Sequence, residues 1–109
     1  MRWAWILFAW GCGGETEPPT CPDPPTYIRD VRPITQRLCL PCHDSALPVD
    51  RRNGAPVGLD FDDFARIQPN AAAFADAMTS GRMPPQGQGV ATPAERSTVS
   101  QWRSCGYTE

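Results

Sequence analysis

Apolar side chains recur at helical spacing just after residue 26. Four of them are separated by four, three and four positions: Tyr27, Val31, Ile34 and Leu38. This spacing puts them on one face of a helix that runs directly into Cys39. We expect Asp30 to be the N-cap of this helix, because Pro33 then lies in the first turn, where a missing N–H loses no intrahelical bond.

Two short helical patterns follow in the middle of the chain. The first consists of three apolar residues at steps of three: Phe61, Phe64 and Ile67. The second covers residues 71–80, with Asn70 as the expected N-cap and Gly81 as the expected end. Both patterns are short and apolar on one side only.

The last helix has the strongest start signal. Thr92, Pro93 and Glu95 match a capping box with proline at the first helical position. Three residues mark its inner face before Gly106 ends it: Val99, Trp102 and Cys105. Because no segment alternates with period two, the sequence predicts an all-α fold of about four short helices.

Two stretches lack a helical pattern. Residues 44–58 are rich in proline and glycine and have no period, which predicts a loop long enough to wrap around something. In the second stretch, Pro84 and Pro85 exclude a helix, and the proline after Met83 favours an extended conformation for that residue.

The N-terminal part of the chain has a different composition. The apolar run of residues 3–10 is too short to span a bilayer but suits a secretory signal, so we predict that residues 1–11 are a signal peptide. The end of this segment resembles a bacterial lipobox, and we favour lipidation of Cys12 over ordinary cleavage after Gly11. Residues 12–26 are dense in proline and predict an extended tether.

These segments leave residues 27–109 as a single domain. We expect it on the periplasmic side of a bacterial membrane, held by lipid on Cys12, with Gly13 favouring the outer membrane. Lysine is absent, and ten arginines are scattered among 12 acidic residues, giving a net charge of −2. This pattern offers no basic surface for nucleic acid. We expect a monomer.

The segment CLPCH, residues 39–43, contains the most informative chemistry and the only histidine of the chain. C-x-x-C-H is the attachment signature of c-type haem, in which two thiols bind the ring and the histidine binds the iron. Zinc is an alternative, although Cys39, Cys42 and His43 would need a fourth ligand such as Cys21 or Cys105. A redox-active disulfide is another, but it expects a βαβ context.

The chain resembles a class I cytochrome c domain over residues 27–107. The resemblance rests on four motifs in order: VRPITQRLCLPCH, GLDF, GRMPP and TPAERSTVSQW. It implies one haem c, attached through Cys39 and Cys42 within a cytochrome c fold. It further implies His43 as the proximal iron ligand, Met83 as the distal ligand, and the Pro56 carbonyl as acceptor of the histidine N–H.

The identity of the distal ligand decides the predicted function. We favour Met83 over Met78, because Met78 lies at helical spacing on an apolar face, where methionine usually fills a core. Histidine and methionine together leave no open iron position, which predicts a single-electron carrier that serves redox protein partners and is not an enzyme. The alternatives are a haem enzyme or ligand sensor with an open sixth site, and a zinc-stabilised binding module.

Several other residues have possible roles in such a domain. Free thiols are disfavoured in an exported chain, and the first and last helices of this fold cross, so Cys21 and Cys105 are expected to form a disulfide. Three arginines are candidates for the haem propionates or for plain solvated surface: Arg51, Arg52 and Arg82. Three aspartates are interpreted as a solvated cluster at a helix N-terminus rather than an acid pair: Asp60, Asp62 and Asp63.

Overall fold

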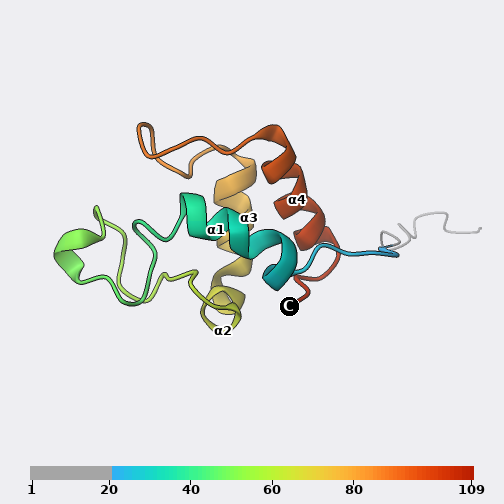
Figure 1. Cartoon of the computed structure of the whole chain (residues 1–109), viewed down its shortest axis with the longest axis horizontal. Helices are drawn as coiled ribbons and strands as arrows, with labels where there is room; N and C mark the ends of the chain where they lie inside the picture. Colours follow the sequence, from blue (N-terminus) through green and yellow to red (C-terminus); the bar gives the residue numbers. More distant parts are fainter. Residues whose placement is uncertain (1–20) are drawn as a thin grey trace, which may run out of the picture.

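The apolar stripe of residues 27–38 lies on one continuous helical segment. The computed structural model describes residues 21–109, and in it the π-helical turn η1 (Tyr27–Val31) continues directly as α1 (Arg32–Leu38) (Figure 1). All four predicted stripe residues are buried: Tyr27, Val31, Ile34 and Leu38. The predicted amphipathic helix is therefore confirmed, including its end next to Cys39.

The start of this segment differs from the prediction, because Thr26 and not Asp30 is the N-cap. The Thr26 hydroxyl accepts a hydrogen bond from the N–H of Arg29 at 3.1 Å. The Asp30 carboxylate accepts one from the N–H of Thr26 at 2.9 Å. Together the two side chains satisfy backbone donors at the helix start, which lies one turn earlier than predicted. Pro33 is still in the first turn of α1, as expected.

The middle of the chain is mostly irregular before it becomes helical. The predicted loop of residues 44–58 contains a single 3₁₀ turn, η2 (Val49–Arg51). It is followed by α2 (Phe64–Ile67), the 3₁₀ turn η3 (Gln68–Asn70) and α3 (Ala71–Thr79). Gly81 follows α3 with a φ of +78°, a conformation that glycine adopts without strain, so the predicted end of this helix is confirmed.

Asn70 is the N-cap residue of α3, as predicted, but its side chain does not cap the helix. Its side chain makes no cap hydrogen bond and instead donates to the carbonyl of Arg66 at 3.5 Å. The preceding 3₁₀ turn already brings helical acceptors to the start of α3, since the N–H of Ala71 bonds to the carbonyl of Gln68. The side-chain cap in this region is Asp63, which accepts a hydrogen bond from the N–H of Arg66 at 2.8 Å.

The last helix, α4 (Pro93–Ser104), begins as predicted. Its capping box is complete: the Thr92 hydroxyl accepts from the N–H of Glu95 at 3.1 Å, and the Glu95 carboxylate accepts from the N–H of Thr92 at 2.9 Å. Gly106 follows the helix with a φ of +92°. Because residues 21–109 contain helices and no strand, the predicted all-α class is confirmed for this part of the chain.

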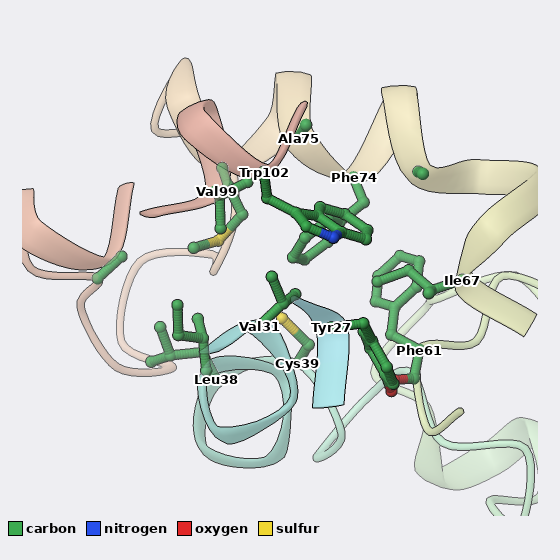
Figure 2. Close-up of a cluster of buried hydrophobic side chains, with 14 residues drawn as sticks. Tyr27, Val31, Leu38, Cys39, Phe61, Ile67, Phe74, Ala75, Val99 and Trp102 are labelled. Carbon is green, nitrogen blue, oxygen red and sulfur yellow. The ribbon is translucent and has the colours of Figure 1, made fainter. Parts of the chain in front are cut away.

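The hydrophobic core joins the first and last helical segments to α3 (Figure 2). Trp102 of α4 is fully buried; its ring centroid lies 6.2 Å from that of Phe74 and 6.4 Å from that of Tyr27. The Tyr27 hydroxyl donates a hydrogen bond to the carbonyl of Phe61 at 2.9 Å. The core therefore fixes the segment after His43 against the helix before Cys39.

A disulfide joins Cys21 to Cys105, as predicted, across 84 positions of sequence with a Cα–Cα distance of 6.0 Å. The chain ends are also tied by hydrogen bonds. The carbonyl of Thr108 accepts from the N–H of Tyr27 at 2.8 Å and from the indole N–H of Trp102 at 2.7 Å. The entry to the domain and its end are thus held together.

Several predictions fall wholly or partly outside the described residues. The signal peptide of residues 1–11, lipid on Cys12 and residues 12–20 of the tether lie there. The remainder of the predicted tether contacts the domain, because Arg29 donates to the Asp23 carboxylate at 3.3 Å and to the Pro24 carbonyl at 3.1 Å. Within residues 21–109, no helix is long and apolar enough to cross a membrane.

Candidate cofactor-binding site

A cavity of about 240 Å³ opens beside the end of α1 and brings together the predicted site residues. Its walls come from the CLPCH turn, the loop of residues 53–59, α3 and the segment of residues 83–88. Five sulfur- or imidazole-bearing residues line it: Cys39, Cys42, His43, Met78 and Met83. Most of the remaining lining is apolar, and no charged side chain of residues 21–109 contributes to it. The site suits an apolar ligand that binds through sulfur and nitrogen.

The two thiols of the CLPCH turn lie at the end of α1. The N–H of Cys39 still bonds to the carbonyl of Thr35 at 2.8 Å, and the carbonyl of Cys39 accepts from the N–H groups of Cys42 at 3.1 Å and His43 at 2.8 Å. This tight turn directs the side chains of Cys39, Cys42 and His43 to one cavity. Both cysteines are free, with Cys39 buried and Cys42 half-buried.

Burial makes Cys39 a poor thiolate. Removal from water, and then the neighbouring Cys42 and Glu95, raise the pKa of the Cys39 thiol to about 12. Without a bound metal, a thiol with this pKa is almost entirely protonated at neutral pH. The disulfide engages Cys21 and Cys105, the two residues that the zinc hypothesis offered as a fourth ligand. The zinc alternative at CLPCH therefore loses support.

The His43 ring is held by a backbone contact. Only 7% of the residue is exposed, and Nδ1 lies 2.8 Å from the carbonyl oxygen of Leu59. A carbonyl only accepts hydrogen bonds, so Nδ1 carries a hydrogen, and in a neutral ring this leaves Nε2 as the nitrogen with a lone pair for a metal. The ring of Phe61 packs on the imidazole at a centroid distance of 4.7 Å. His43 is thus oriented to bind a metal through Nε2.

The acceptor for the histidine N–H was predicted at Pro56 and is found at Leu59. The N–H of Phe61 bonds to the carbonyl of His43 at 2.9 Å, which brings the chain alongside His43 and directs the Leu59 carbonyl, two residues earlier, at the ring. The Pro56 carbonyl accepts from Arg52 instead, at 2.9 Å. The acceptor therefore lies three residues after the predicted proline, within the GLDF motif of residues 58–61.

The two methionines reach the same cavity from different surroundings. Met78 of α3 is fully buried, which agrees with its predicted core position, and it also lines the cavity. Met83 is 39% exposed and belongs to the proline-containing segment, whose backbone is tied to α3 by a 3.2 Å hydrogen bond from its N–H to the carbonyl of Ala77. Assignment of Met83 as an iron ligand stays a prediction.

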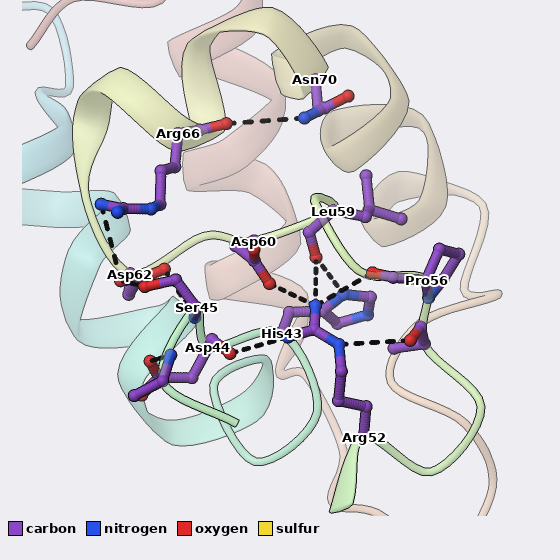
Figure 3. A network of polar contacts seen from close by, with 12 residues as sticks. His43, Asp44, Ser45, Arg52, Pro56, Leu59, Asp60, Asp62, Arg66 and Asn70 are labelled. Carbon is purple, nitrogen blue, oxygen red and sulfur yellow. Dashed lines mark hydrogen bonds and ion pairs between the residues drawn. The ribbon is translucent and has the colours of Figure 1, made fainter. Parts of the chain in front are cut away.

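The predicted propionate-binding arginines do not line the cavity. Arg52, expected at the surface or on a propionate, is instead buried and forms an ion pair with Asp60 (Figure 3). Arg82 pairs with Asp76 at 2.8 Å, and Arg51 is exposed. The Arg52–Asp60 pair could not be predicted from the sequence, because the two residues are joined by an irregular loop that has no helical or strand periodicity.

The three aspartates have separate roles. Asp63 caps α2, as the predicted helix N-terminal cluster implies. Asp62 accepts hydrogen bonds from the N–H and hydroxyl of Ser45 at 3.1 and 2.6 Å. Burial opposes the charge of Asp62, but these hydrogen bonds outweigh it and hold the pKa of that carboxyl below its usual value. Asp60 was predicted to be solvated, and this is wrong, because it is the buried partner of Arg52.

Comparison with protein-family models, with curated proteins and with solved structures finds no match to this chain.

Proposed function

We propose that this chain is a small exported monohaem c-type cytochrome of the class I fold that carries single electrons. In this proposal Cys39 and Cys42 would attach haem c, and His43 and Met83 would bind its iron. The supporting observation is the combination of two free thiols and a carbonyl-bound histidine on one tight turn beside an apolar cavity. When bound between histidine and methionine, haem iron supplies one-electron oxidation and reduction.

The chain contributes attachment, orientation and a dry environment. Cys39 and Cys42 provide thiols for two covalent bonds, and the Leu59 carbonyl keeps Nε2 of His43 as the basic nitrogen. Phe61 and Phe74 cover part of the cavity wall with aromatic surface. A low-polarity wall limits access of water, which is one of the means by which a protein adjusts a reduction potential.

The location and partners belong to the same proposal. Cleavage before Cys12 and lipid on that residue would hold the domain on the periplasmic side of a bacterial membrane, with redox proteins as its partners. Mass spectrometry of the protein extracted from membranes tests this part, because a lipidated Cys12 adds the mass of acyl chains to a polypeptide that begins at that residue.

Expression in a host with the haem c attachment machinery tests the assignment. We expect a coloured protein whose haem stays with the polypeptide after denaturation. A Cys39→Ser, Cys42→Ser double variant should lose this covalent haem, whereas a Cys21→Ser, Cys105→Ser variant, matched in chemistry, should keep it. A colourless wild-type protein with stoichiometric zinc would overturn the proposal.

A second candidate is a haem protein with an open sixth position, either an enzyme or a ligand sensor. The exposure of 39% of Met83 favours it, because an exposed side chain is more easily displaced from the iron than a buried one. Replacing Met83 with alanine separates the two functions. An electron carrier should bind carbon monoxide only after this substitution, and a Met78→Leu control should behave as the wild type. Rapid carbon monoxide binding by the wild type would instead assign the second function.

A further inference from the structure

Arg52 directs its guanidinium into the loop that follows His43, and only 1% of the residue is exposed (Figure 3). Nε donates to the carbonyl of Ala55 at 3.2 Å, and one terminal nitrogen donates to the carbonyl of Asp44 at 2.8 Å. The other terminal nitrogen donates to the carbonyl of Pro56 at 2.9 Å, lies 3.5 Å from the carbonyl of Leu59 and forms the ion pair with Asp60. All three nitrogens of one side chain are thus used within a single loop.

The residues that Arg52 contacts lie next to both the donor and the acceptor of the hydrogen bond that orients His43. Asp44 directly follows His43, which supplies the ring N–H. Pro56 and Asp60 enclose Leu59, whose carbonyl accepts that N–H. One guanidinium therefore connects the Asp44 backbone next to the donor with the Pro56 backbone before the acceptor and the Asp60 side chain after it.

We infer that Arg52 is a positioning residue for His43: by joining the Asp44, Pro56 and Asp60 segments, it keeps the Leu59 carbonyl directed at Nδ1. The inference rests on the proposed function in so far as His43 is taken to be the iron ligand. The partner of the second ring nitrogen sets both the orientation and the basicity of a ligating histidine. Arg52 therefore acts on the iron through Leu59 and His43, without reaching the cavity itself.

The chemistry of the group favours positioning over simple stabilisation. A buried ion pair contributes little net stability, since both charges lose their hydration. Here the guanidinium donates mainly to backbone carbonyls, and its flat shape fixes their relative positions. A single ammonium nitrogen in the same place has no means of occupying three separated donor sites.

The test uses Arg52→Lys in the full chain loaded with haem, because lysine keeps the charge that faces Asp60 and removes the planar fork. We expect the Nδ1–H of His43 to exchange with solvent about tenfold faster, as measured by NMR on the reduced protein. The reduction potential should rise, because a less basic imidazole stabilises ferric iron less. The matched control is Arg29→Lys, at an exposed arginine that also pairs with an aspartate, Asp23; it should leave both values unchanged.

Equal exchange rates and potentials in Arg52→Lys and wild type overturn the inference. A second variant, Asp60→Asn, removes the charge of the pair but keeps the arginine fork and an amide oxygen that accepts from it, so its exchange rate should rise less than that of Arg52→Lys. Exchange in Asp60→Asn as fast as in Arg52→Lys assigns the effect to the charge pair and also overturns the inference; if Arg52→Lys does not fold, a tenfold or larger increase in Asp60→Asn overturns it. A haem stain on the same samples tests the proposed function separately from the inference about Arg52. Colourless wild-type protein contradicts the proposed function, whereas equal exchange rates in haem-loaded Arg52→Lys and wild type contradict the inference about Arg52 alone.

Discussion

A charged side chain with 1% of its surface exposed, such as Arg52, is tolerated only when its partners are present. Replacing Arg52 with methionine keeps much of the side-chain volume but leaves the Asp60 carboxylate buried without its counter-charge. We expect a loss of about 3–5 kcal/mol in the free energy of unfolding, the range for breaking a buried pair from one side. Urea unfolding followed by far-UV circular dichroism measures it.

Arg51 provides the control, because it is the adjacent arginine and is exposed. Arg51→Met should change the free energy of unfolding by less than about 0.5 kcal/mol, as is usual for surface positions. Similar losses of unfolding free energy in Arg51→Met and Arg52→Met would contradict the expected cost of burying Asp60 without its counter-charge.

The sequence predicted correctly the common location of those site residues that lie close together in the chain. Cys39, Cys42 and His43 are close in the chain, so their common direction follows from one tight turn. The Leu59 acceptor lies 16 positions from His43, across an irregular loop. Its approach depends on the path of that loop, which no periodicity encodes, and the prediction of Pro56 therefore failed.

At the helix starts, too, signals that lie within one turn were predicted more reliably than those that depend on the surrounding structure. The capping box of Thr92 and Glu95 was predicted because both partners lie within one turn. Thr26 was missed because the π-helical turn η1 places its N-cap before the segment that Pro33 suggested. Asn70 is at the predicted N-cap position, but the residues before it are already helical, and its side chain makes no cap hydrogen bond. Local signals identified the helices but not every boundary.

Glu95 links the start of α4 to α1 and should make stability depend on pH. Burial opposes its charge, but the ion pair with Arg37 and the hydrogen bonds with Thr92 outweigh burial and hold the pKa of Glu95 below its usual value. A carboxyl whose pKa is lowered by folding stabilises the protein above the pKa of the unfolded chain, and this stabilisation is lost as the pH falls through the folded-state pKa. We expect Glu95→Gln to be less stable than wild type at neutral pH.

The difference between wild type and Glu95→Gln should narrow as the pH is lowered from about 7 to about 3, across the usual range of glutamate. Thermal unfolding at several pH values measures it. Glu109→Gln makes the same chemical change at the exposed end of the chain and should match wild type at neutral pH. A constant difference for Glu95→Gln at all pH values would contradict the role of its charge.

For the whole molecule, the disulfide between Cys21 and Cys105 constrains nearly all of the described chain. The domain is small, so its hydrophobic core alone gives limited stability. The bridge closes a loop across 84 positions, and the chain-entropy account assigns a loop of this length about 4.5 kcal/mol, mainly through the unfolded state. Sequence reasoning reached this pair only through the expected crossing of the first and last helices, because cysteine spacing alone does not determine connectivity.

A Cys21→Ser, Cys105→Ser variant should therefore lose up to about 4.5 kcal/mol in the free energy of unfolding, and addition of a reductant to the wild type should give a comparable loss. Urea titrations with and without reductant measure both. The double variant is its own control, because a reductant should leave its midpoint unchanged. The hydrogen bonds of Thr108 to Tyr27 and Trp102 persist without the bridge, so the variant should still fold and keep the cavity beside α1. If the double variant is as stable as the oxidised wild type, these hydrogen bonds and the core already hold the chain ends together, and the covalent link contributes no stability.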